Sequence, residues 1–283
     1  MTPAPKPPHR AFSPRSVAIT GGATGIGFAL AKRLGSGGDV RVAIGEPRPE
    51  RLEAGVAQLR AAGVDARGLA MDVTDPAQME RFAEFVWTKQ GAADLLINNA
   101  GVILEPRALA DQPIDEIRRL FDVNFFGVVQ GCGSFGPRMV AAGAPAAIYN
   151  VGSENSFFPA APNIAAYVAS KHAVRGLTVA LREEYPDHVT IGLICPGFVK
   201  SEMTAPPFGD LAMDTDAFAA MAVEQILARE TYVVSRSYNV ERFRPIHAEI
   251  EAAYARAAPR SAGDERFDVR HLIEMASKKE RLK

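Results

Sequence analysis

The sequence predicts an α/β protein with one doubly wound domain, built on a seven-stranded parallel sheet that is flanked by helices. Two observations support this prediction. Short apolar runs alternate with segments of helical spacing along most of the chain, and a glycine-rich turn follows the first of those runs. Such alternation is typical of parallel strands joined by helices. We find no internal repeat and no second alternation pattern, so a single domain is predicted within the 283 residues.

The elements follow from the chain in order. Five prolines in residues 1–14 fix φ and remove backbone donors, so this stretch is predicted to be a flexible, extended arm. Residues 15–260 are predicted to form the core domain and residues 261–283 a C-terminal extension. The apolar runs predict strands at 16–20, 40–44, 66–71, 94–97, 146–150, 190–195 and 231–234. Helical spacing predicts helices at 28–34, 49–62 and 165–184, and Asp75 before Pro76 predicts the N-cap of another.

Composition and charge exclude several classes of protein. Hydrophobic residues make up 47% of the chain, which is enough apolar surface to offset chain entropy and excludes a wholly disordered protein. The 32 basic and 33 acidic residues nearly cancel, so no basic field attracts a nucleic acid. No apolar run approaches the roughly 18 residues of a membrane span, and residues 1–14 lack a secretory signal. We therefore expect a cytoplasmic protein without nucleic-acid or membrane partners.

Cysteine and histidine usage gives no sign of a metal site. Cys132 and Cys195 are the two cysteines of the chain, too few for a disulfide framework, and we expect both to be reduced and buried. The five histidines are scattered, without His-x-x-x-His or Cys-x-x-Cys spacing. We expect no catalytic metal.

A glycine-rich turn joins the first predicted strand to the first predicted helix. The run TGGATGIG at 20–27 places Gly21, Gly25 and Gly27 in a GxxxGxG pattern. Glycines at this spacing allow a tight turn and a close backbone approach to pyrophosphate, while the helix N-terminus faces the phosphates. The strand–turn–helix setting therefore predicts a dinucleotide site of the Rossmann type.

An acidic residue stands where such sites bind the adenosine ribose. Glu46 follows Gly27 by about 20 residues, at the end of the second strand, where a carboxylate accepts hydrogen bonds from the ribose and repels a 2′-phosphate. This predicts NAD as the cofactor, with NADP less favoured. Two alternatives stay open: Glu46 is a solvated loop residue, or the nearby Arg48 weakens the discrimination.

Three polar side chains are candidates for the chemistry. Tyr167 and Lys171 lie four residues apart on the predicted helix 165–184, so they share one face. Ser153 lies just past the strand 146–150. Ligands of parallel sheets bind outside the carboxyl ends of the strands. We expect one crevice there to collect these side chains, the glycine-rich turn, residues 98–101 and the Pro196-Gly197 turn.

At these residues the chain resembles the short-chain dehydrogenase/reductase family in its single-domain form. The matching elements are TGGATGIG at 20–27, Asp72, NNAG at 98–101, Asn124 in DVNFFG, Ser153, YVASK at 167–171 and PGFVKS at 196–201. They run in the family's order through nearly the whole predicted core.

The resemblance implies a catalytic tetrad of Asn124, Ser153, Tyr167 and Lys171. It also implies cofactor contacts from the glycine-rich turn and the strand ends, namely Gly21, Thr24, Gly25, Ile26, Gly27, Glu46, Asp72, Val73, Asn98, Ala100, Gly101, Tyr167, Lys171, Pro196, Gly197, Val199 and Ser201. The family more often has threonine at the position of Ser201, a change that keeps the hydroxyl. We expect Asn99 and Gly101 to shape the backbone rather than touch substrate.

The residue types indicate how this tetrad would act. Lys171 and a positive nicotinamide ring favour the phenolate, so we expect the pKa of Tyr167 to fall below its usual value near 10. Tyr167 would then take the alcohol proton while a hydride moves to the nicotinamide, and Ser153 would hold the substrate oxygen. The resemblance further implies that Lys171 binds the nicotinamide ribose and that Asn124 anchors a water. Ser156 stays an alternative to Ser153.

The substrate and the rival functions are less sharply defined. Phe157, Phe158 and the segment 203–218, with Phe208, Leu211 and Met213, indicate an apolar or aromatic secondary alcohol or ketone; core packing is the alternative for the phenylalanines. The stretch 216–250 loosely resembles bacterial Cα-dehydrogenases acting on lignin-derived aryl alcohols. An epimerase or dehydratase of the extended type is a second alternative. It would need GxxGxxG spacing and a larger C-terminal substrate domain, and the sequence shows neither. A non-catalytic dinucleotide sensor stays the alternative function, although such proteins typically lack the Tyr/Lys pair.

A stripe of small residues on the helix 165–184 bears on assembly. Ala166, Ala169, Ala173 and Gly176 recur at spacings of three and four, away from Tyr167 and Lys171. Small side chains let two helices approach closely, and family members commonly pair this helix across a two-fold axis. We predict a homodimer or homotetramer; packing of the stripe on the protein's own sheet is the alternative.

Overall fold

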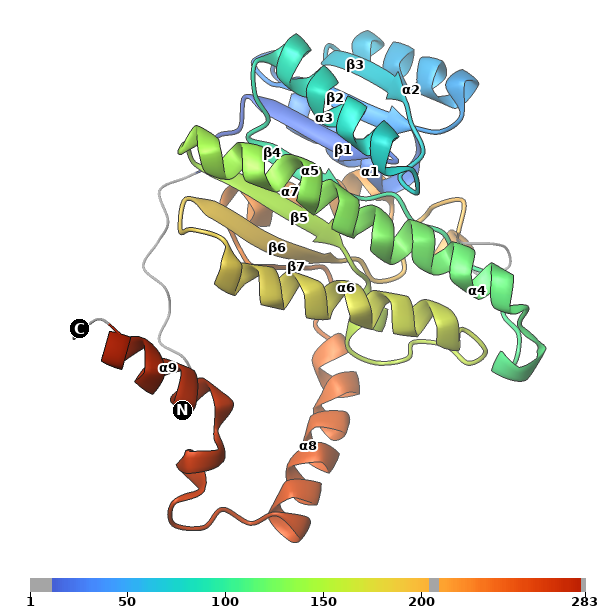
Figure 1. The fold of residues 1–283 in the computed structure, drawn as a ribbon. Helices are drawn as coiled ribbons and strands as arrows, with labels where there is room; N and C mark the ends of the chain where they lie inside the picture. Colours follow the sequence, from blue (N-terminus) through green and yellow to red (C-terminus); the bar gives the residue numbers. More distant parts are fainter. Residues whose placement is uncertain (1–11, 204–208, 281–283) are drawn as a thin grey trace. The chain divides into compact units, whose positions relative to one another are not determined.

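A computed structural model of the chain describes residues 12–203 and 209–280 and divides it into two compact units, one ending at Arg236 and one beginning at Ser237 (Figure 1). Most of the predicted arm (1–11) and Phe208 of the predicted substrate segment lie outside the described residues. Phe12 is buried, and its backbone N–H donates to the Leu227 carbonyl at 3.0 Å. The predicted limits at 14 and 260 stay a prediction.

The first unit is built on a seven-stranded parallel sheet, which confirms the predicted fold class. The strand order is β3-β2-β1-β4-β5-β6-β7. The strands are β1 (Ser16–Thr20), β2 (Arg41–Glu46), β3 (Asp65–Ala70), β4 (Leu95–Asn98), β5 (Ala146–Val151), β6 (Val189–Cys195) and β7 (Tyr232–Val234). The strand order reverses between β1 and β4, where Thr20 pairs with Asn98. In doubly wound sheets such a reversal opens a crevice at the carboxyl ends of the strands.

Helices cover both faces of the sheet, as expected for parallel strands. One face is covered by α1 (Gly25–Gly35), α2 (Pro49–Ala61) and α7 (Thr215–Leu227), and the other by α3 (Pro76–Gln90), α5 (Gly127–Ala142) and α6 (Ala165–Glu184). Successive residues of β1 serve the two cores in turn: Val17 and Ile19 pack on the first side and Ala18 on the second.

Local signals explain where individual helices begin. Asp75 caps α3 by accepting from the backbone N–H groups of Ala77 and Gln78, and Pro76 occupies the first helical position, as predicted. The first helix begins at Gly25, three residues earlier than predicted from apolar spacing, because its first turn consists of the glycine-rich motif itself. The helix α4 (Ile114–Phe121) runs through a π-helical turn, η2 (Asp122–Phe126), into α5.

The second unit consists of helical elements: α8 (Asn239–Ala257), the short turn η5 (Asp264–Phe267) and α9 (Val269–Glu280). Among the described residues, no helix combines the length and the apolar character that a membrane crossing requires.

Candidate active site

The glycine-rich turn is shaped by close backbone packing at the end of β1. A Cβ on Gly21, which has φ +62°, would lie 2.9 Å from the Cα of Ala100, and a Cβ on Gly27 would lie 2.4 Å from the Asn99 amide nitrogen. That amide nitrogen donates to the carbonyls of Thr20 at 3.0 Å and Gly21 at 2.8 Å. Asn99 therefore holds the turn in shape, as expected, and larger residues at the two glycines would break it.

The first turn of α1 fits a diphosphate. Thr24 is the N-cap in an extended conformation, and among the described residues it makes no capping bond through its side chain. The backbone N–H groups that begin a helix carry a partial positive charge and lack partners within the helix. Ser201 lies against this turn, with its Cβ 3.7 Å from the position of a Cβ on Gly25. Gly25, Ile26 and Gly27 thus form a cradle that a phosphate group can approach.

Glu46 is the last residue of β2 and is 3% exposed, so it is not the solvated loop residue of the alternative interpretation. Its carboxylate accepts from the Arg48 guanidinium at 2.5 Å, and the Arg48 side chain is 52% exposed. A second basic residue, Arg51, bonds both carboxylate oxygens of Glu202 at 2.5 and 2.6 Å. The proximity of Arg48 to Glu46, which the sequence left open, is therefore a direct contact.

Asp72 and Val73, which follow β3, have different partners. The Asp72 carboxylate accepts from both the backbone N–H and the hydroxyl of Thr74 at 2.9 Å. The side chain of Val73 is buried and lies against Gly127, where a Cβ would come within 2.9 Å of it. Asp72 thus has a defined orientation at the sheet edge, whereas Val73 packs against α5.

Asn98, a predicted cofactor contact, turns its side chain into the protein. Its amide nitrogen donates to the side-chain oxygen of Asn150 at 2.9 Å and contacts the Cys132 sulfur at 3.6 Å. Its amide oxygen has no hydrogen-bond partner among the described residues. Both cysteines are buried thiols, and burial raises the pKa of each to about 12. A cofactor contact from Asn98 would therefore have to come from its backbone.

Backbone hydrogen bonds and a β-bridge hold the segment after β6 in place. The Pro196 carbonyl accepts from the Glu154 backbone N–H at 2.9 Å, and the Gly197 N–H donates to the Ser235 hydroxyl at 3.2 Å. Val199 is buried and forms a parallel bridge with Met213. Pro196 therefore lies beside the end of β5, Gly197 beside the residue after β7, and Val199 beside Met213.

Lys171 is buried beside Tyr167 on α6. Its ammonium donates to the Val151 carbonyl at 2.9 Å and lies 5.7 Å from the centre of the Tyr167 ring. Burial lowers the pKa of Lys171 to about 8. A Cβ on Gly101 would lie 3.6 Å from the Lys171 nitrogen and 3.3 Å from the Asn124 side-chain oxygen, so a glycine leaves room beside both groups.

Ser153 begins the short turn η3 (Glu154–Ser156) at the end of β5. Ser156, the alternative catalytic hydroxyl, is fully buried; it donates to the Lys171 carbonyl at 2.9 Å and accepts from the Ser153 backbone N–H at 3.2 Å. Its hydroxyl is thus committed to the backbone. Ser153, whose side chain bonds that of Tyr167, is the better candidate for contact with a substrate.

The pKa of Tyr167 departs from the sequence-based expectation. Burial of the phenol raises its pKa, a hydrogen bond from Ser153 lowers it, and the negative charge of Glu154 raises it again. The sequence-based expectation is that Lys171 and a positive nicotinamide ring together lower this pKa; without the ring, Lys171 does not lower it. In the structure the Lys171 ammonium is directed to the Val151 carbonyl, so the loss of solvation is the dominant effect.

Asn124 lies in the π-helical turn η2 and is fully buried. Its side chain accepts from the Val102 N–H at 2.8 Å and donates to the Val102 carbonyl at 2.9 Å. It also donates to the Ser170 hydroxyl at 3.2 Å. Asn124 therefore ties the segment after β4 to α6, next to Lys171; π-helical turns of this kind are frequent at functional sites.

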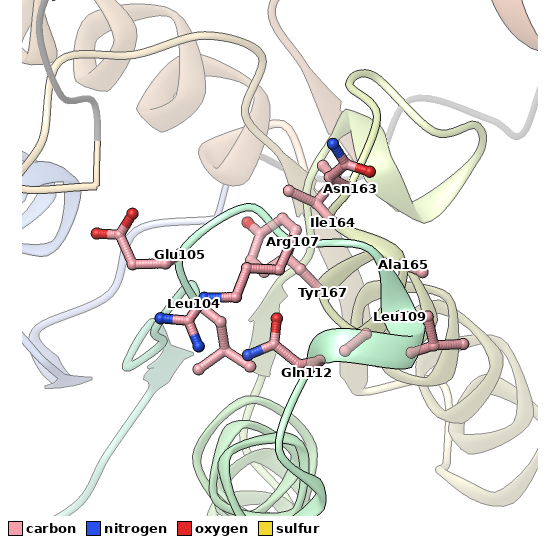
Figure 2. A pocket seen from close by; sticks show the side chains of 10 residues that line it. Leu104, Glu105, Arg107, Leu109, Gln112, Asn163, Ile164, Ala165 and Tyr167 are labelled. Carbon is pink, nitrogen blue, oxygen red and sulfur yellow. The ribbon is translucent and has the colours of Figure 1, made fainter.

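A small pocket opens beside Tyr167 (Figure 2). Its walls include Leu104, Leu109 and Ile164, together with the charged Glu105 and Arg107. The phenylalanines that were candidate substrate contacts pack elsewhere. Phe158 is buried, and Phe157 lies under the Arg175 guanidinium and beside the Tyr232 ring. Core packing, the alternative interpretation, therefore describes both phenylalanines.

Two buried neighbours of Ser153 were missed by the sequence reasoning. Glu154 and Asn155 are 9% and 7% exposed, and both lie in η3. Their position directly after Ser153 was the only signal in the sequence. Within the described ranges, no group of three or more His, Cys, Asp or Glu side chains is arranged to hold a metal ion.

Comparison with known proteins identifies relatives of this chain. Residues 15–210 match the family model described as short chain dehydrogenase. The chain is 35% identical over 195 residues to 1-deoxy-11-beta-hydroxypentalenate dehydrogenase of Streptomyces avermitilis, covering 68% of this chain and 72% of that protein. A short-chain dehydrogenase/reductase of Burkholderia phymatum in complex with NAD is 27% identical, with a TM-score of 0.78 over 86% of this chain and 96% of that one. An alcohol dehydrogenase of the archaeon Thermococcus sibiricus complexed with 5-hydroxy-NADP is 26% identical, with a TM-score of 0.68 over 77% and 93%.

Proposed function

Because the chain belongs to the short-chain dehydrogenase/reductase family of oxidoreductases, we propose that it transfers a hydride between a nicotinamide dinucleotide and a secondary alcohol or ketone. The observation that supports this most strongly is the joint placement of Ser153, Tyr167 and Lys171. They lie where β5 ends and α6 begins, on the edge of the sheet that carries the glycine-rich turn.

The dinucleotide would be held along this edge by the residues predicted from the sequence. The cradle at Gly25, Ile26 and Gly27 would bind the diphosphate, with Gly21 shaping the turn before it, and Asp72 would contact the adenine end. For Asn98 we propose a backbone contact, because its side chain is engaged with Asn150. Ser201, beside Gly25, would reach toward the nicotinamide end.

We propose NAD as the preferred cofactor, with NADP less favoured. The supporting observation is the buried carboxylate of Glu46 at the end of β2, where a 2′-phosphate would meet a like charge. Arg48, bonded to that carboxylate, opposes this preference because it could pair with a phosphate. Similar solved structures contain either NAD or 5-hydroxy-NADP, which supports a nicotinamide dinucleotide in general.

Side chains of the protein would donate and accept the proton of the reacting oxygen. When bound, the nicotinamide supplies or accepts the hydride. The raised pKa of Tyr167 keeps its phenol protonated at neutral pH, which suits the protonation of a ketone oxygen in the reductive direction. In the oxidative direction Tyr167 takes the alcohol proton, and this requires the phenolate, so oxidation should be faster at alkaline pH. Ser153 donates to the reacting oxygen as negative charge develops on it.

We propose an apolar or aromatic substrate and a homodimeric or homotetrameric assembly in the cytoplasm. The apolar walls at Leu104, Leu109 and Ile164 support the substrate class. The assembly is supported by exposed small residues on α6. Ala169 is exposed, and a Cβ placed on Gly176 would have no described atom within 4 Å apart from its own chain neighbours and the adjacent backbone of the helix. A partner helix could approach that face closely.

The test is calorimetric titration with NADH, followed by a screen of apolar and aromatic secondary alcohols and ketones. Tyr167→Phe should lower kcat by at least about 100-fold and change the affinity for NADH by no more than about threefold, because the hydroxyl acts on the substrate while the ring packs. A variant that keeps more than about a tenth of kcat would contradict the acid/base role of Tyr167. Tight NADH binding without turnover of any compound would instead favour a non-catalytic sensor.

A further inference from the structure

Asn155 lies two residues after Ser153 and is 7% exposed. Its side-chain oxygen accepts from the Ala160 backbone N–H at 2.9 Å, which fixes the orientation of the amide because a backbone N–H can only donate. The amide nitrogen therefore faces Ser153 and lies 3.3 Å from its hydroxyl oxygen. The backbone N–H of Asn155 donates to the same oxygen at 3.1 Å.

These two bonds determine what the Ser153 hydroxyl can do. A hydroxyl group has one hydrogen and two acceptor positions. Asn155 occupies both acceptor positions with N–H groups, so the hydroxyl hydrogen must point elsewhere. The side chain of Tyr167 is its partner there. In this arrangement Ser153 is a donor toward the site and not an acceptor.

We propose that Asn155 is a positioning residue, which fixes the Ser153 hydroxyl as a hydrogen-bond donor toward the oxygen that reacts. This inference rests on the proposed hydride transfer, in which negative charge develops on the substrate oxygen. A donor stabilises that charge, whereas a hydroxyl turned to present its lone pair would repel it. Asn155 bonds the Ser153 hydroxyl, so we place its action on the reacting oxygen through Ser153.

Several charged or titratable groups surround Tyr167 and could also move its titration. Glu154 comes from η3, Glu105 and Arg107 from the segment after β4, and Lys171 from α6 itself. Cys195 at the end of β6 interacts with Lys171. Asn155 is neutral, so its effect on Tyr167 must pass through the Ser153 hydrogen bond, and the experiment must separate that effect from charge.

The first variant is Asn155→Asp, which keeps the size of the side chain and reverses the bond. One carboxylate oxygen still accepts from Ala160, while the other faces Ser153 and can only accept. The Ser153 hydrogen is then drawn away from Tyr167. We expect kcat to fall by about 100-fold, as for the loss of one preorganised donor. The uncharged control Asn155→Ala keeps the backbone donor, and we expect a loss of about threefold to tenfold.

A double-mutant cycle tests whether Asn155 acts through Ser153. In the Ser153→Ala background, Asn155→Ala should lower the residual kcat by less than about twofold, because the group on which it acts is gone. Melting temperature and affinity for NADH, measured on every variant, report any general damage to the fold. Equal losses from Asn155→Ala in the two backgrounds would overturn the proposal, and so would an Asn155→Asp protein with more than half of the wild-type kcat.

A second readout needs no turnover, so it separates this proposal from the proposed function. The Cζ resonance of isotope-labelled Tyr167, assigned with Tyr167→Phe, gives the pKa of the phenol in the protein alone. Asn155→Asp should raise that pKa by about one or more, and by less than half as much in the Ser153→Ala background, where charge alone acts. An equal rise in both backgrounds would overturn the proposal. A wild-type protein inactive on every alcohol, but with the expected titrations, would refute the function and leave the positioning intact.

Discussion

Replacing the buried Lys171 by methionine should abolish turnover and, at neutral pH, stabilise the fold. Lys171 is 4% exposed, and burial lowers the pKa of its ammonium from 10.5 to about 8. A difference of this size corresponds to about 3 kcal/mol of unfavourable folding free energy when the group is protonated. Methionine fills a similar volume without the charge. The loss of the bond to the Val151 carbonyl costs about 1–2 kcal/mol, so the net gain is about 1–2 kcal/mol.

The pH dependence gives the sharper test, and its sign follows from the direction of the shift. Because the folded protein binds this proton more weakly than the unfolded chain, the cost is fully present below about pH 8 and disappears as the pH rises toward 10.5. The stability advantage of Lys171→Met should therefore shrink by about 2 kcal/mol between about pH 7 and pH 9.5. Groups that do not interact with Lys171 titrate equally in both proteins and cancel in the difference. Cys195 does interact with Lys171, but burial raises the pKa of its thiol to about 12, above this pH range.

The assay is urea unfolding of the wild type and Lys171→Met at several pH values, in the absence of cofactor. Lys89→Met, at an exposed position near the end of α3, is the matched control, and its stability difference from the wild type should vary by less than about 0.5 kcal/mol over the same range. If the stability difference between Lys171→Met and the wild type also varies by less than about 0.5 kcal/mol over this pH range, the buried amine does not destabilise the fold as argued. The reasoning about this site would then be wrong.

Two further predictions concern the cofactor and the assembly. Glu46→Ser should narrow the ratio of kcat/KM for NAD over NADP by at least about tenfold, because it removes the like charge that a 2′-phosphate would meet and frees Arg48; a wild type that already prefers NADP would refute the role of Glu46. Ala169→Arg should reduce the oligomeric mass measured by light scattering after gel filtration, since a buried unpaired charge costs about 3–5 kcal/mol at an interface. A wild-type mass near that of one 30.3 kDa chain, or an unchanged oligomer in the variant, would end the interface prediction.

The fold was predictable because its signals are local. Strand runs such as 16–20 lie at the predicted positions, since strands buried on both faces read as continuous apolar segments. Asp75 before Pro76 predicted the start of α3, because the aspartate side chain caps the first turn and the proline ring fixes a helical φ. The helix Ala165–Glu184 has the predicted limits, and its four-residue spacing alone places Tyr167 and Lys171 on one face.

The location of the candidate site residues at the strand ends was predictable, but the directions in which their side chains point were not. Asn98, Ser156 and Phe157 all lie at the expected edge of the sheet. Their side chains nevertheless turn to Asn150, to the Lys171 carbonyl and to the core. Such choices depend on partners that are distant in sequence, as for Asn98 and Asn150 on neighbouring strands. No local pattern carries that information.

What the sequence determined by itself is the order of strands and helices and the set of polar residues at the strand ends, because both follow from periodicity and from the spacing of motifs. The pKa shifts of the site residues depend on the tertiary structure alone. Burial raises the pKa of Tyr167 and lowers that of Lys171, and the Lys171 ammonium bonds Val151. The tertiary structure also decided that Asn155 would hold Ser153 as a donor. Desolvation and hydrogen-bond direction depend on what surrounds a group in three dimensions, and packing sets those surroundings.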